Sequence, residues 1–479
     1  MAPKTAVVFV LPPSPSDTNP PLGPAILART ARRAGGAVFV RDLNIAYLQQ
    51  FRERSTITEP AVKTLGDQGK DRVLAATAAS TLYRQFALDP SGALFVPDVA
   101  TAEAGMHFSE TAINRAIDEH VARPSDLAAW ISYHLEKFDS EAGVPDIVGV
   151  SLMGPSQVFS SLLLLRLAKQ RWSNAVIVVG GSHVTLLAAT TQGSQLIRAF
   201  ADITLPGHSE QDFVHLVTGN GSVPDAEEFD YEPFFESNQL SRYDRDKLVL
   251  PVQFSRGCVY GKCTFCTYPV VEPVATRIRA ERAVATLRSL KETHRVERFS
   301  LKDSLVPQQD LLSLAQTIRA DELPVSWSAT TLPRRAVGAM AAELAAGGLR
   351  TLEFGVESIH PANQALIRKS CSRDDVERMI EQLGAAGVVS VVNLMFGFPG
   401  ESEEQAEEQL AWAAGLRQRY GDVVDFSLNL LEIVRGSPME REAERFGVVG
   451  VAPWAYAYEW DSPPWRKDFA PRLRELERR

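Results

Sequence analysis

The chain has 479 residues, of which 45% are hydrophobic and 23% charged, and this is the composition of a globular protein large enough for two or three domains. Its formal net charge of -9 argues against a nucleic-acid partner, which would require a concentrated basic surface. No apolar stretch reaches membrane-spanning length, and prolines stop the N-terminal apolar run. We therefore expect a cytoplasmic protein with neither a membrane nor a nucleic-acid partner.

Residues 1–223 alternate strand and helix patterns. Five short apolar runs have the length of buried strands: Ala6–Leu11, Val38–Val40, Ile147–Ser151, Val176–Val179 and Asp202–Leu205. Helical patterns over Leu22–Arg33 and Phe159–Gln170 lie between them. This alternation predicts an α/β domain with a doubly wound, Rossmann-like parallel sheet.

Between the second and third strands, residues 45–143 follow a different pattern. Lys70–Phe86 and Glu110–Phe138 have amphipathic helical spacing, and Pro90–Pro97 lies between them. We interpret residues 45–143 as a helical insertion, which either contributes to function or is structural decoration. Residues 224–247 are acidic and aromatic with interspersed prolines, so we interpret them as a linker.

Residues 248–447 repeat βα units. The predicted strands are Leu248–Phe254, Phe299–Leu301, Val325–Ser328, Thr351–Gly355, Val389–Met395 and Asp425–Leu431. The predicted helices are Ala280–Glu292, Gln308–Ile318, Arg335–Ala346, Arg373–Ala386 and Glu403–Arg417. Such repetition predicts a partial or full (β/α) barrel, with its active site at the C-terminal ends of the strands. Residues 448–479, which include Trp454, Trp460 and Trp465, are expected to form a C-terminal cap.

Three of the four cysteines lie close together in the sequence. Cys258, Cys263 and Cys266 follow the first barrel strand, whereas Cys371 is distant. Thiolates bind iron–sulfur clusters, usually four to a cubane, so three would leave one iron without a protein ligand and open to chemistry. Two alternatives remain open at this point. One is a Cys3His zinc site completed by His294, which would indicate a non-catalytic scaffold, and the other is a thioredoxin-like redox pair at Cys263 and Cys266.

The run SRGCVYGKCTFC resembles the cluster loop of the radical S-adenosylmethionine (SAM) superfamily, usually CxxxCxxC with an aromatic residue before the last cysteine. Phe265 holds the aromatic position, and the extra residue between the first two cysteines is similar to cobalamin-associated members. The resemblance implies a [4Fe–4S] cluster on Cys258, Cys263 and Cys266, with SAM on the vacant iron and Phe265 beside it. It further implies that an external flavodoxin- or ferredoxin-type reductant supplies the electron that cleaves SAM to methionine and a 5′-deoxyadenosyl radical.

Three later segments resemble strands of the same family. LEFGVESIHPANQALIRKS is similar to the fourth strand, where Glu357 would hydrogen-bond the polar groups of SAM. NLMFGFPGESEEQ is similar to the fifth strand, where Gly397 and Gly400 would let the backbone approach the adenine, and LLEIVRGSPMEREAERFG is similar to the last. Taken alone, Glu357 is a strand-end carboxylate and the two glycines a turn. Ser372 is expected to cap the following helix, and Cys371 is either a thiol that contacts substrate or a bystander.

The N-terminal half resembles the cobalamin-binding domain of one radical SAM branch. The similar stretches are VFVLPPSPSDTNPPLGPAILARTARRAGG, PDIVGVSLMGPSQ, VVGGSHVTL and ADITLPGHSE. Doubly wound sheets bind ligands at the carboxyl ends of their strands, so the resemblance implies cobalamin contacts from Ser151, Gly154, Gly180, Gly181, Gly207 and Glu210. The D-x-H-x-x-G signature is absent, so no histidine is expected below the cobalt. The alternative is a Rossmann-like domain without a cofactor.

Together these features predict a radical SAM enzyme that acts on an unreactive centre of a small molecule in specialised metabolism. If cobalamin binds, methyl transfer is the first choice. The alternative is cobalamin-independent SAM chemistry, either transfer of the 3-amino-3-carboxypropyl group or a radical rearrangement. The sequence does not name the substrate.

Overall fold

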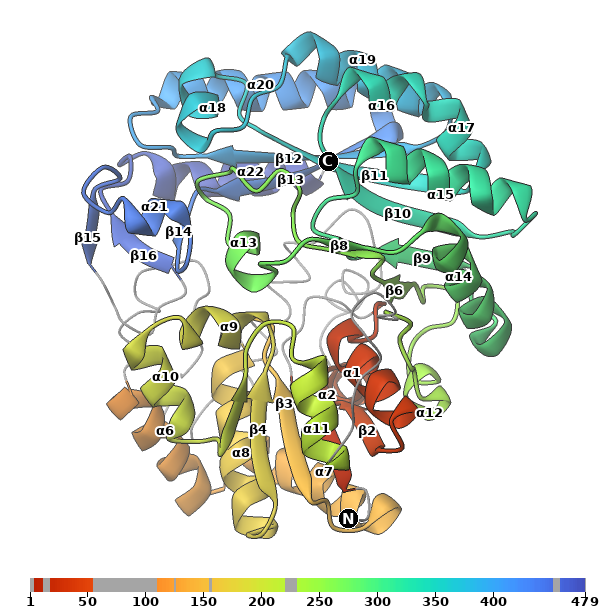
Figure 1. Ribbon diagram of the computed structural model, residues 1–479. Coiled ribbons are helices and arrows are strands. Elements are labelled where there is room, and N and C mark those ends of the chain that lie inside the picture. Colours follow the sequence, from red (N-terminus) through yellow and green to blue (C-terminus); the bar gives the residue numbers. More distant parts are fainter. Residues whose placement is uncertain are drawn as a thin grey trace. The chain divides into compact units, whose positions relative to one another are not determined.

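The computed structural model describes residues 4–11, 18–54, 110–124, 126–154, 157–219, 231–450 and 457–478. The predictions for Lys70–Phe86, Pro90–Pro97 and Trp454 fall outside these residues. The chain divides into two compact units, and the main boundary between them falls after Lys247 (Figure 1). Gly450 and residues 457–459 group with the first unit. None of the helices in the described ranges combines the length and apolar character needed to cross a membrane.

A five-stranded parallel sheet forms the centre of the first unit. Its strands are β1 (Thr5–Val10), β2 (Ala37–Asp42), β3 (Ile147–Ser151), β4 (Val176–Gly180) and β5 (Ile203–Leu205). They lie in the order β2-β1-β3-β4-β5, and all neighbours pair in parallel. The chain therefore builds the sheet outward from β1 in both directions, which confirms the predicted doubly wound sheet.

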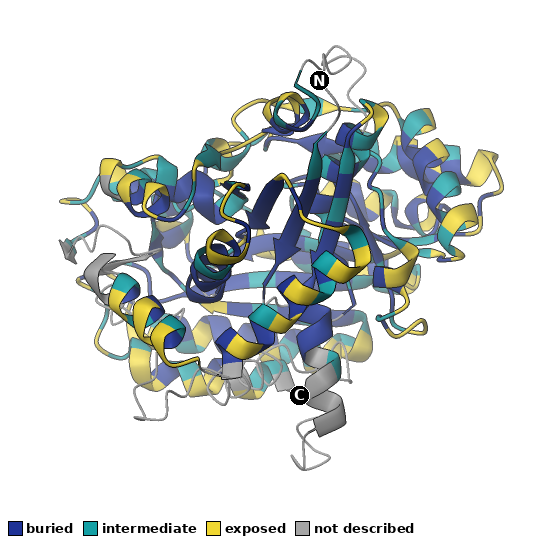
Figure 2. Ribbon diagram, turned by 90° about the horizontal axis from the view of Figure 1, so that it is seen from below, coloured by how far each residue is buried: buried dark blue, intermediate teal, exposed yellow. Residues whose placement is uncertain are grey.

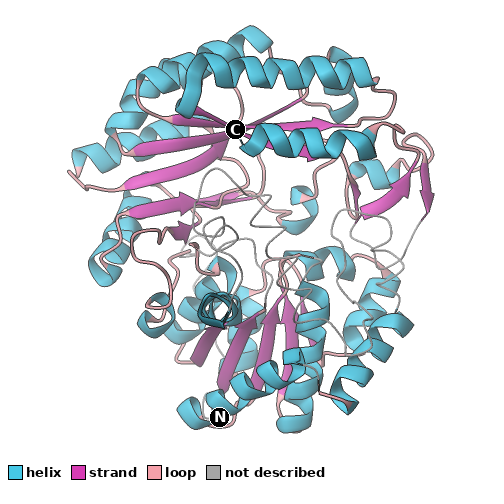
Figure 3. Cartoon of the chain, turned by 180° about the vertical axis from the view of Figure 1, so that it is seen from behind, coloured by secondary structure: helices cyan, strands magenta, loops and turns pink. Residues whose placement is uncertain are grey.

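Helices cover both faces of this sheet (Figure 3). They are α1 (Leu22–Arg33), α2 (Leu43–Arg54), α6 (Glu110–Ala122), α7 (Asp126–Ala142), α8 (Val158–Arg171), α9 (Ser182–Ala188), α10 (Thr191–Arg198) and α11 (Glu210–Thr218). On one face, Phe138 of α7 packs edge-to-face on Phe9 of β1 at 6.3 Å between ring centroids, in a core shared with α6 and α8. On the other face, α1 and α11 pack through Ala28 and Val214.

The described part of the predicted insertion therefore shares the core of the sheet. The predicted helical stretch Glu110–Phe138 is interrupted between α6 and α7. Pro124 lies at this interruption and cannot continue the helical hydrogen bonds.

Residues 231–247 of the predicted linker pack against the first unit. Glu232 pairs with Arg29 at 2.7 Å, and Glu236 pairs with Arg41 at 3.0 Å. The helix α12 (Ser237–Leu240) follows these two pairs. These contacts tie the segment to α1 and β2 before the chain enters the second unit.

The second unit contains an open six-stranded parallel sheet. Its strands are β6 (Leu250–Val252), β9 (Arg298–Leu301), β10 (Ser326–Thr331), β11 (Leu349–Glu357), β12 (Val389–Phe396) and β13 (Val424–Leu430). They follow one another in chain order across the sheet and pair in parallel. Successive parallel strands joined by helices form a (β/α) barrel that does not close, which confirms the predicted partial barrel.

Helices cover the outer face of this sheet, and their outward sides are exposed while the strands are buried (Figure 2). They are α14 (Ala280–His294), α15 (Gln308–Ala320), α16 (Arg335–Ala339), α17 (Ala341–Ala346), α18 (Pro361–Ile367), α19 (Arg373–Ala385) and α20 (Glu403–Tyr420). The single helix predicted over Arg335–Ala346 is thus two helices that meet at Met340. The break lets α16 lie against α19 while α17 lies against α15.

Shorter elements complete the second half of the chain. The antiparallel ribbon of β7 (Ser255–Arg256) and β8 (Thr276–Arg277) flanks α13 (Tyr268–Val271). A small sheet has the order β14-β16-β15, with β14 (Ile433–Val434), β15 (Val448–Gly450) and β16 (Ala457–Trp460). The remaining elements are a 3-10 turn (Gly421–Val423), α21 (Pro438–Arg441) and α22 (Arg466–Arg478), and α22 packs on β13.

Candidate active site

The loop with the three clustered cysteines begins at a buried carboxylate. Asp303 follows β9 and is 4% exposed. Its carboxylate accepts hydrogen bonds from the backbone N–H of Phe254 at 3.1 Å and from both the N–H and the hydroxyl of Ser255. Burial raises the pKa of Asp303 to about 6, and these donors oppose that rise. The carboxylate at the end of one barrel strand therefore fixes the chain that leaves the neighbouring strand.

A second carboxylate orients the backbone directly before Cys258. Glu272 accepts hydrogen bonds from the N–H of Gly257 and from the side chain of Gln253, both at 2.9 Å. Gly257 has a φ of 74°, and a Cβ there would lie 2.9 Å from the Cα of Ala275. Only glycine fits this position without strain, so the turn into the cysteine loop is locally determined.

Further along, the loop is fastened to a neighbouring βα unit. The Thr264 hydroxyl donates to the carbonyl of Leu366 at 3.0 Å, and its N–H donates to the carbonyl of Ile367 at 3.1 Å. Its own carbonyl accepts the N–H of Met439 at 2.9 Å. Thr264 lies between Cys263 and Cys266, so these three bonds fix the backbone of the C-x-x-C segment.

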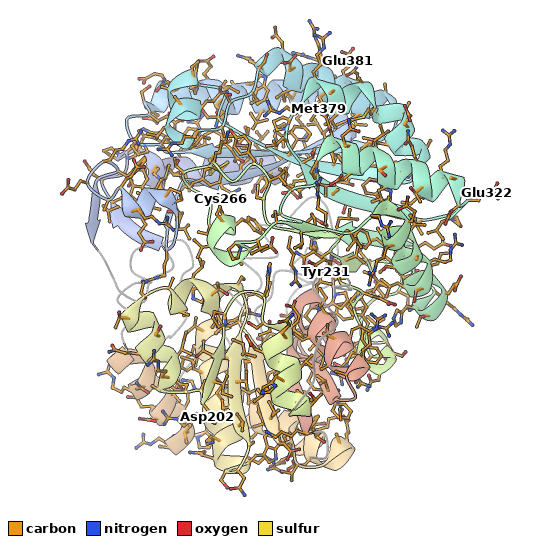
Figure 4. The ribbon with its side chains drawn as sticks, in the orientation of Figure 1. Asp202, Tyr231, Cys266, Glu322, Met379 and Glu381 are labelled. Atoms are coloured by element: carbon orange, nitrogen blue, oxygen red, sulfur yellow. The ribbon has the colours of Figure 1, made fainter. Side chains whose placement is uncertain are left out.

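The three clustered cysteines are partly shielded from solvent, since Cys263 is buried and Cys258 and Cys266 are half-buried. Cys263 is 9% exposed, and burial raises its pKa to about 12; burial raises the pKa of Cys266 as well. In both cases the ammonium group of Lys369 opposes the rise. Figure 4 shows Cys266 beside α13, on the side of the sheet opposite α19, which carries Met379 and Glu381. Thiols bind metal after losing their proton, so the nearby cation favours the ligating form.

Glu357 ends β11 in an unusual backbone conformation. Its φ is 65°, a left-handed value that is uncommon outside glycine and that clusters at functional sites. Its carboxylate accepts a hydrogen bond from Lys369 Nζ at 2.8 Å, and the two side chains are 9% and 12% exposed. Gly355 makes room for the pair, because a Cβ on Gly355 would overlap both charged groups. The structure therefore contains a buried ion pair at this position, whereas the sequence analysis identified only its carboxylate, Glu357.

The turn after β12 is organised by Glu401. Its carboxylate accepts hydrogen bonds from the N–H groups of Gly397 at 2.5 Å and Phe398 at 3.1 Å, and from the Asn363 side chain at 2.7 Å. Gly397 and Gly400 have φ values of 80° and 79°, which favour glycine. A Cβ on Gly397 would meet the Arg466 side chain at 2.6 Å, whereas no atom of the described ranges lies within 4 Å of one on Gly400. In this structure the group that lies closest to Gly397 is the side chain of Arg466 in α22.

Cys371 has contacts of its own on the βα unit that begins with β11. Its sulfur lies 3.9 Å from both the Gln364 Nε2 and the carbonyl of Val356. Burial raises its pKa to about 11, and Lys369 opposes the rise. The thiol is therefore protonated at neutral pH.

The zinc alternative does not fit this arrangement. His294 ends α14 and so lies just before the start of β9, while the cysteines follow the opposite end of its neighbour β6. Among the described residues, no three His, Cys, Asp or Glu side chains converge where they could hold a single metal ion. In a cubane each thiolate binds its own iron, so its ligands need not converge on one point.

In the first unit, the predicted cobalamin-contacting residues lie at the C-terminal edge of the sheet, where the parallel strands end. They lie at or just after the C-terminal ends of β3, β4 and β5, which are adjacent strands: Ser151 and Gly154, then Gly180 and Gly181, then Gly207 and Glu210. Parallel strands place their carboxyl ends together, so the three loops are neighbours. Ser151 and Glu210 are buried, at 7% exposure each.

The glycines at this edge have different roles. Gly181 has a φ of 107°, and a Cβ there would overlap the backbone of Leu152. A Cβ on Gly180 would lie 3.0 Å from the carbonyl of Leu205. Among the described residues, nothing lies within 4 Å of a Cβ on Gly154 or Gly207. Gly180 and Gly181 are thus required by the sheet itself, while Gly154 and Gly207 border open space.

Residues 252–413 match the model of the radical SAM superfamily. The matched segment contains the three clustered cysteines, the Glu357–Lys369 pair and the Gly397 turn. The chain therefore contains a radical SAM domain. Its predicted cofactors SAM and [4Fe–4S] are those of this superfamily.

Known proteins resemble this radical SAM enzyme over most of its length. An uncharacterized methyltransferase of Pyrococcus horikoshii is 23% identical over 318 residues, which is 61% of this chain and 67% of that protein. The radical SAM methyltransferase TsrM of Kitasatospora setae, solved with cobalamin and a [4Fe–4S] cluster, is 17% identical with a TM-score of 0.60, covering 94% of this chain and 80% of its own. The cobalamin-dependent enzyme OxsB is 12% identical with a TM-score of 0.57, covering 95% and 64%. At these identities the likeness of the solved structures establishes the fold.

Sequence reasoning missed the residues that support the radical SAM site. They are Asp303, Glu272, Thr264, Lys369 and Glu401. Asp303 and Glu401 follow predicted strands closely, which is a usable signal, because polar side chains at the C-terminal ends of barrel strands mark the functional face. Thr264 and Lys369 carry no such local signal, because the partners of Thr264 are distant in the chain and Lys369 meets Glu357 only through the folded turn between them.

Proposed function

We propose that this radical SAM enzyme is a cobalamin-dependent methyltransferase that methylates an unreactive centre of a small molecule in specialised metabolism. The observation that carries the proposal is the combination, in one chain, of the cysteine loop with a doubly wound sheet whose edge borders open space at Gly154 and Gly207. TsrM, which has this fold, holds cobalamin and a [4Fe–4S] cluster, and the Pyrococcus relative is named a methyltransferase.

Three thiols supply the metal site in this proposal. Cys258, Cys263 and Cys266 would hold the [4Fe–4S] cluster, since the hydrogen bonds of Thr264 fix the loop that presents them. The fit is supported by the donor set, because thiolates are the usual ligands of such clusters. Cys371 is not a ligand in this assignment.

The groups around the thiols would hold SAM. Glu357 and Lys369 form a buried pair of opposite charges, which matches a zwitterionic methionyl end. Phe265 would lie beside SAM, and the Gly397 and Gly400 turn would border its adenine. Cobalamin would lie on the loops of Ser151, Gly154, Gly180, Gly181, Gly207 and Glu210, without a histidine ligand.

When bound, the cluster supplies the electron that cleaves SAM and cobalamin supplies a carrier for the methyl group. The protein's own part is orientation and charge. Asp303 and Glu272 fix the start of the loop, and Cys263 itself is buried, so its thiol is largely shielded from water. A flavodoxin- or ferredoxin-type protein would deliver the electron.

Anaerobic reconstitution with iron, sulfide, SAM, hydroxocobalamin and a reductant tests the proposal. We expect iron and cobalt to remain bound after desalting, and mass spectrometry to find S-adenosylhomocysteine or 5′-deoxyadenosine derived from SAM. Iron without cobalt, together with 5′-methylthioadenosine, would contradict it and favour transfer of the 3-amino-3-carboxypropyl group. Iron without cobalt, and no transferred group, would favour a rearrangement.

A further inference from the structure

The ion pair of Lys369 and Glu357 is buried rather than at the surface. Lys369 Nζ donates to Glu357 Oε1 at 2.8 Å, and both side chains are almost fully buried. Gly355 has no Cβ in the space that the pair occupies. The chain before Lys369 is itself tied to the cysteine loop, because the Tyr260 hydroxyl donates to the carbonyl of Arg368 at 2.6 Å.

The segment that carries Lys369 is bonded to the cysteine loop at two further points. Thr264 donates from its hydroxyl to the carbonyl of Leu366 at 3.0 Å and from its N–H to the carbonyl of Ile367 at 3.1 Å. Burial lowers the pKa of Lys369, but the carboxylate of Glu357 raises it, and the net effect is a raised pKa. Lys369 is therefore an ammonium ion at neutral pH. A buried cation and a buried anion thus lie side by side, and the cation belongs to the segment that is bonded to the cysteine loop.

We propose that Lys369 is a positioning residue that orients Glu357 for SAM and makes the cluster easier to reduce. The inference rests on the proposed function, because it takes the cluster to lie on Cys258, Cys263 and Cys266. Reduction brings one electron from the external reductant and adds one negative charge to the cluster. A cation in a poorly solvated pocket stabilises that added charge, and a carboxylate destabilises it.

The two members of the pair should therefore shift the reduction potential in opposite directions. For Lys369→Met we expect the ratio of reduced to oxidised cluster at a fixed potential to fall at least tenfold. For a one-electron couple this corresponds to a reduction potential lower by about 59 mV. For Glu357→Gln we expect the ratio to rise. Lys369→Arg keeps the charge and should stay within about threefold of the wild type, although its fork geometry differs.

The experiment is a redox titration of the reconstituted full-length protein, followed by the electron paramagnetic resonance signal of the reduced cluster. Lys262→Met is the matched control, since Lys262 is the residue before Cys263 but is exposed to solvent. Its charge is screened by water, so its removal should leave the ratio within about threefold of the wild type. The double variant Lys369→Met/Glu357→Gln leaves no lone buried charge, and its ratio should return toward the wild-type value.

The outcomes separate the inference from the proposed function. A wild-type protein that binds no iron contradicts the proposed function. If the wild type binds iron, equal shifts in the same direction for Lys369→Met and Glu357→Gln overturn the inference, as does a Lys369→Arg shift as large as that of Lys369→Met. If Lys369→Met loads no cluster, the other two variants decide. A higher ratio of reduced to oxidised cluster in Glu357→Gln, with a ratio near that of the wild type in the double variant, supports the inference. An unchanged ratio in both variants overturns it.

Discussion

The C-terminal edges of the two parallel sheets are built in contrasting ways. In the barrel, buried charged side chains organise the edge: Asp303, Glu357 with Lys369, and Glu401 each hold backbone or a counter-charge. In the doubly wound sheet, glycines and backbone atoms form most of the predicted binding edge, and Gly181 packs directly on Leu152. A buried carboxylate is stable only while its hydrogen-bond donors and counter-charges are present. A binding surface made of glycines instead requires that the space beside them stays empty.

This contrast separates two kinds of sensitivity. Substitutions at the C-terminal edge of the barrel sheet change charge and metal ligation. They should therefore alter cluster loading, the affinity for SAM and the reduction potential of the cluster. Substitutions at the edge of the first unit change volume, so they should act through steric exclusion or through the sheet itself.

The largest effect is expected at the barrel thiols. Replacing Cys258, Cys263 or Cys266 by Ala should abolish the cluster, because a cubane with two protein thiolates loses a third of its anchoring. Iron analysis and the visible spectrum after anaerobic reconstitution measure this. Cys371→Ala is the matched control and should keep its iron. Full iron in Cys263→Ala would remove that residue from the ligand set.

The first unit should respond to bulk at Gly154. Gly154→Trp places a side chain in open space, so the sheet should fold while cobalamin is displaced and iron is retained. Cobalt per chain after desalting is the measurement. Gly415→Trp in α20 adds the same bulk at another open position and should leave the cobalt content unchanged. Wild-type cobalt in Gly154→Trp would argue against binding at this edge.

Gly181→Trp offers a different test at the same edge. Its side chain would overlap the backbone of Leu152, and its φ of 107° suits glycine alone. We therefore expect a destabilised first unit, measured as a lower melting temperature. A normally folded Gly181→Trp would contradict the packing described here.

At Glu357 the expected effect is an affinity change. Glu357→Gln removes a charge-assisted contact, which typically costs about 1.5–3 kcal/mol, or roughly 10- to 150-fold in SAM binding. Calorimetric titration of the cluster-loaded protein measures this, and the iron content should stay at the wild-type level. An unchanged affinity would place SAM elsewhere.

The smallest effect is a pH dependence in the first unit. Burial lowers the pKa of His134 to about 4 from the usual 6.5, and its ring packs on Trp130 at 4.6 Å between centroids. Between pH 6.5 and 4 the unfolded chain binds a proton that the folded state excludes, so stability falls as the pH falls. The loss should be about 2 kcal/mol from pH 6.5 to 5. His134→Phe keeps the packing and should flatten the dependence in urea denaturation; an equally steep loss would assign it to other groups.

Local sequence patterns predicted most of the elements that carry these sites. The pattern over Ile147–Ser151 matches β3, and Ser372 caps α19 as expected, with its hydroxyl accepting the N–H of Asp375. These features depend on neighbouring residues only. The break at Met340 was not predicted, because it results from the packing of α16 and α17 on different helices.

The same distinction applies to the candidate site. The cysteines are recognisable because their spacing is a property of one loop. Lys369 follows Arg368 and has the local appearance of a solvated basic pair. Its burial results from the conformation of Glu357 and the missing Cβ of Gly355, both of which lie on another element.

The hydrogen bonds of Thr264 have a consequence for biogenesis. Its hydroxyl partner, Leu366, is 102 residues further along the chain, and the Met439 N–H that closes the loop comes later still. A chain emerging from the ribosome thus displays all three cysteines well before the groups that arrange them have been made. Cluster assembly should therefore follow synthesis of the barrel, and a chain truncated before Met439 should be a poor acceptor for iron and sulfide despite retaining every thiol.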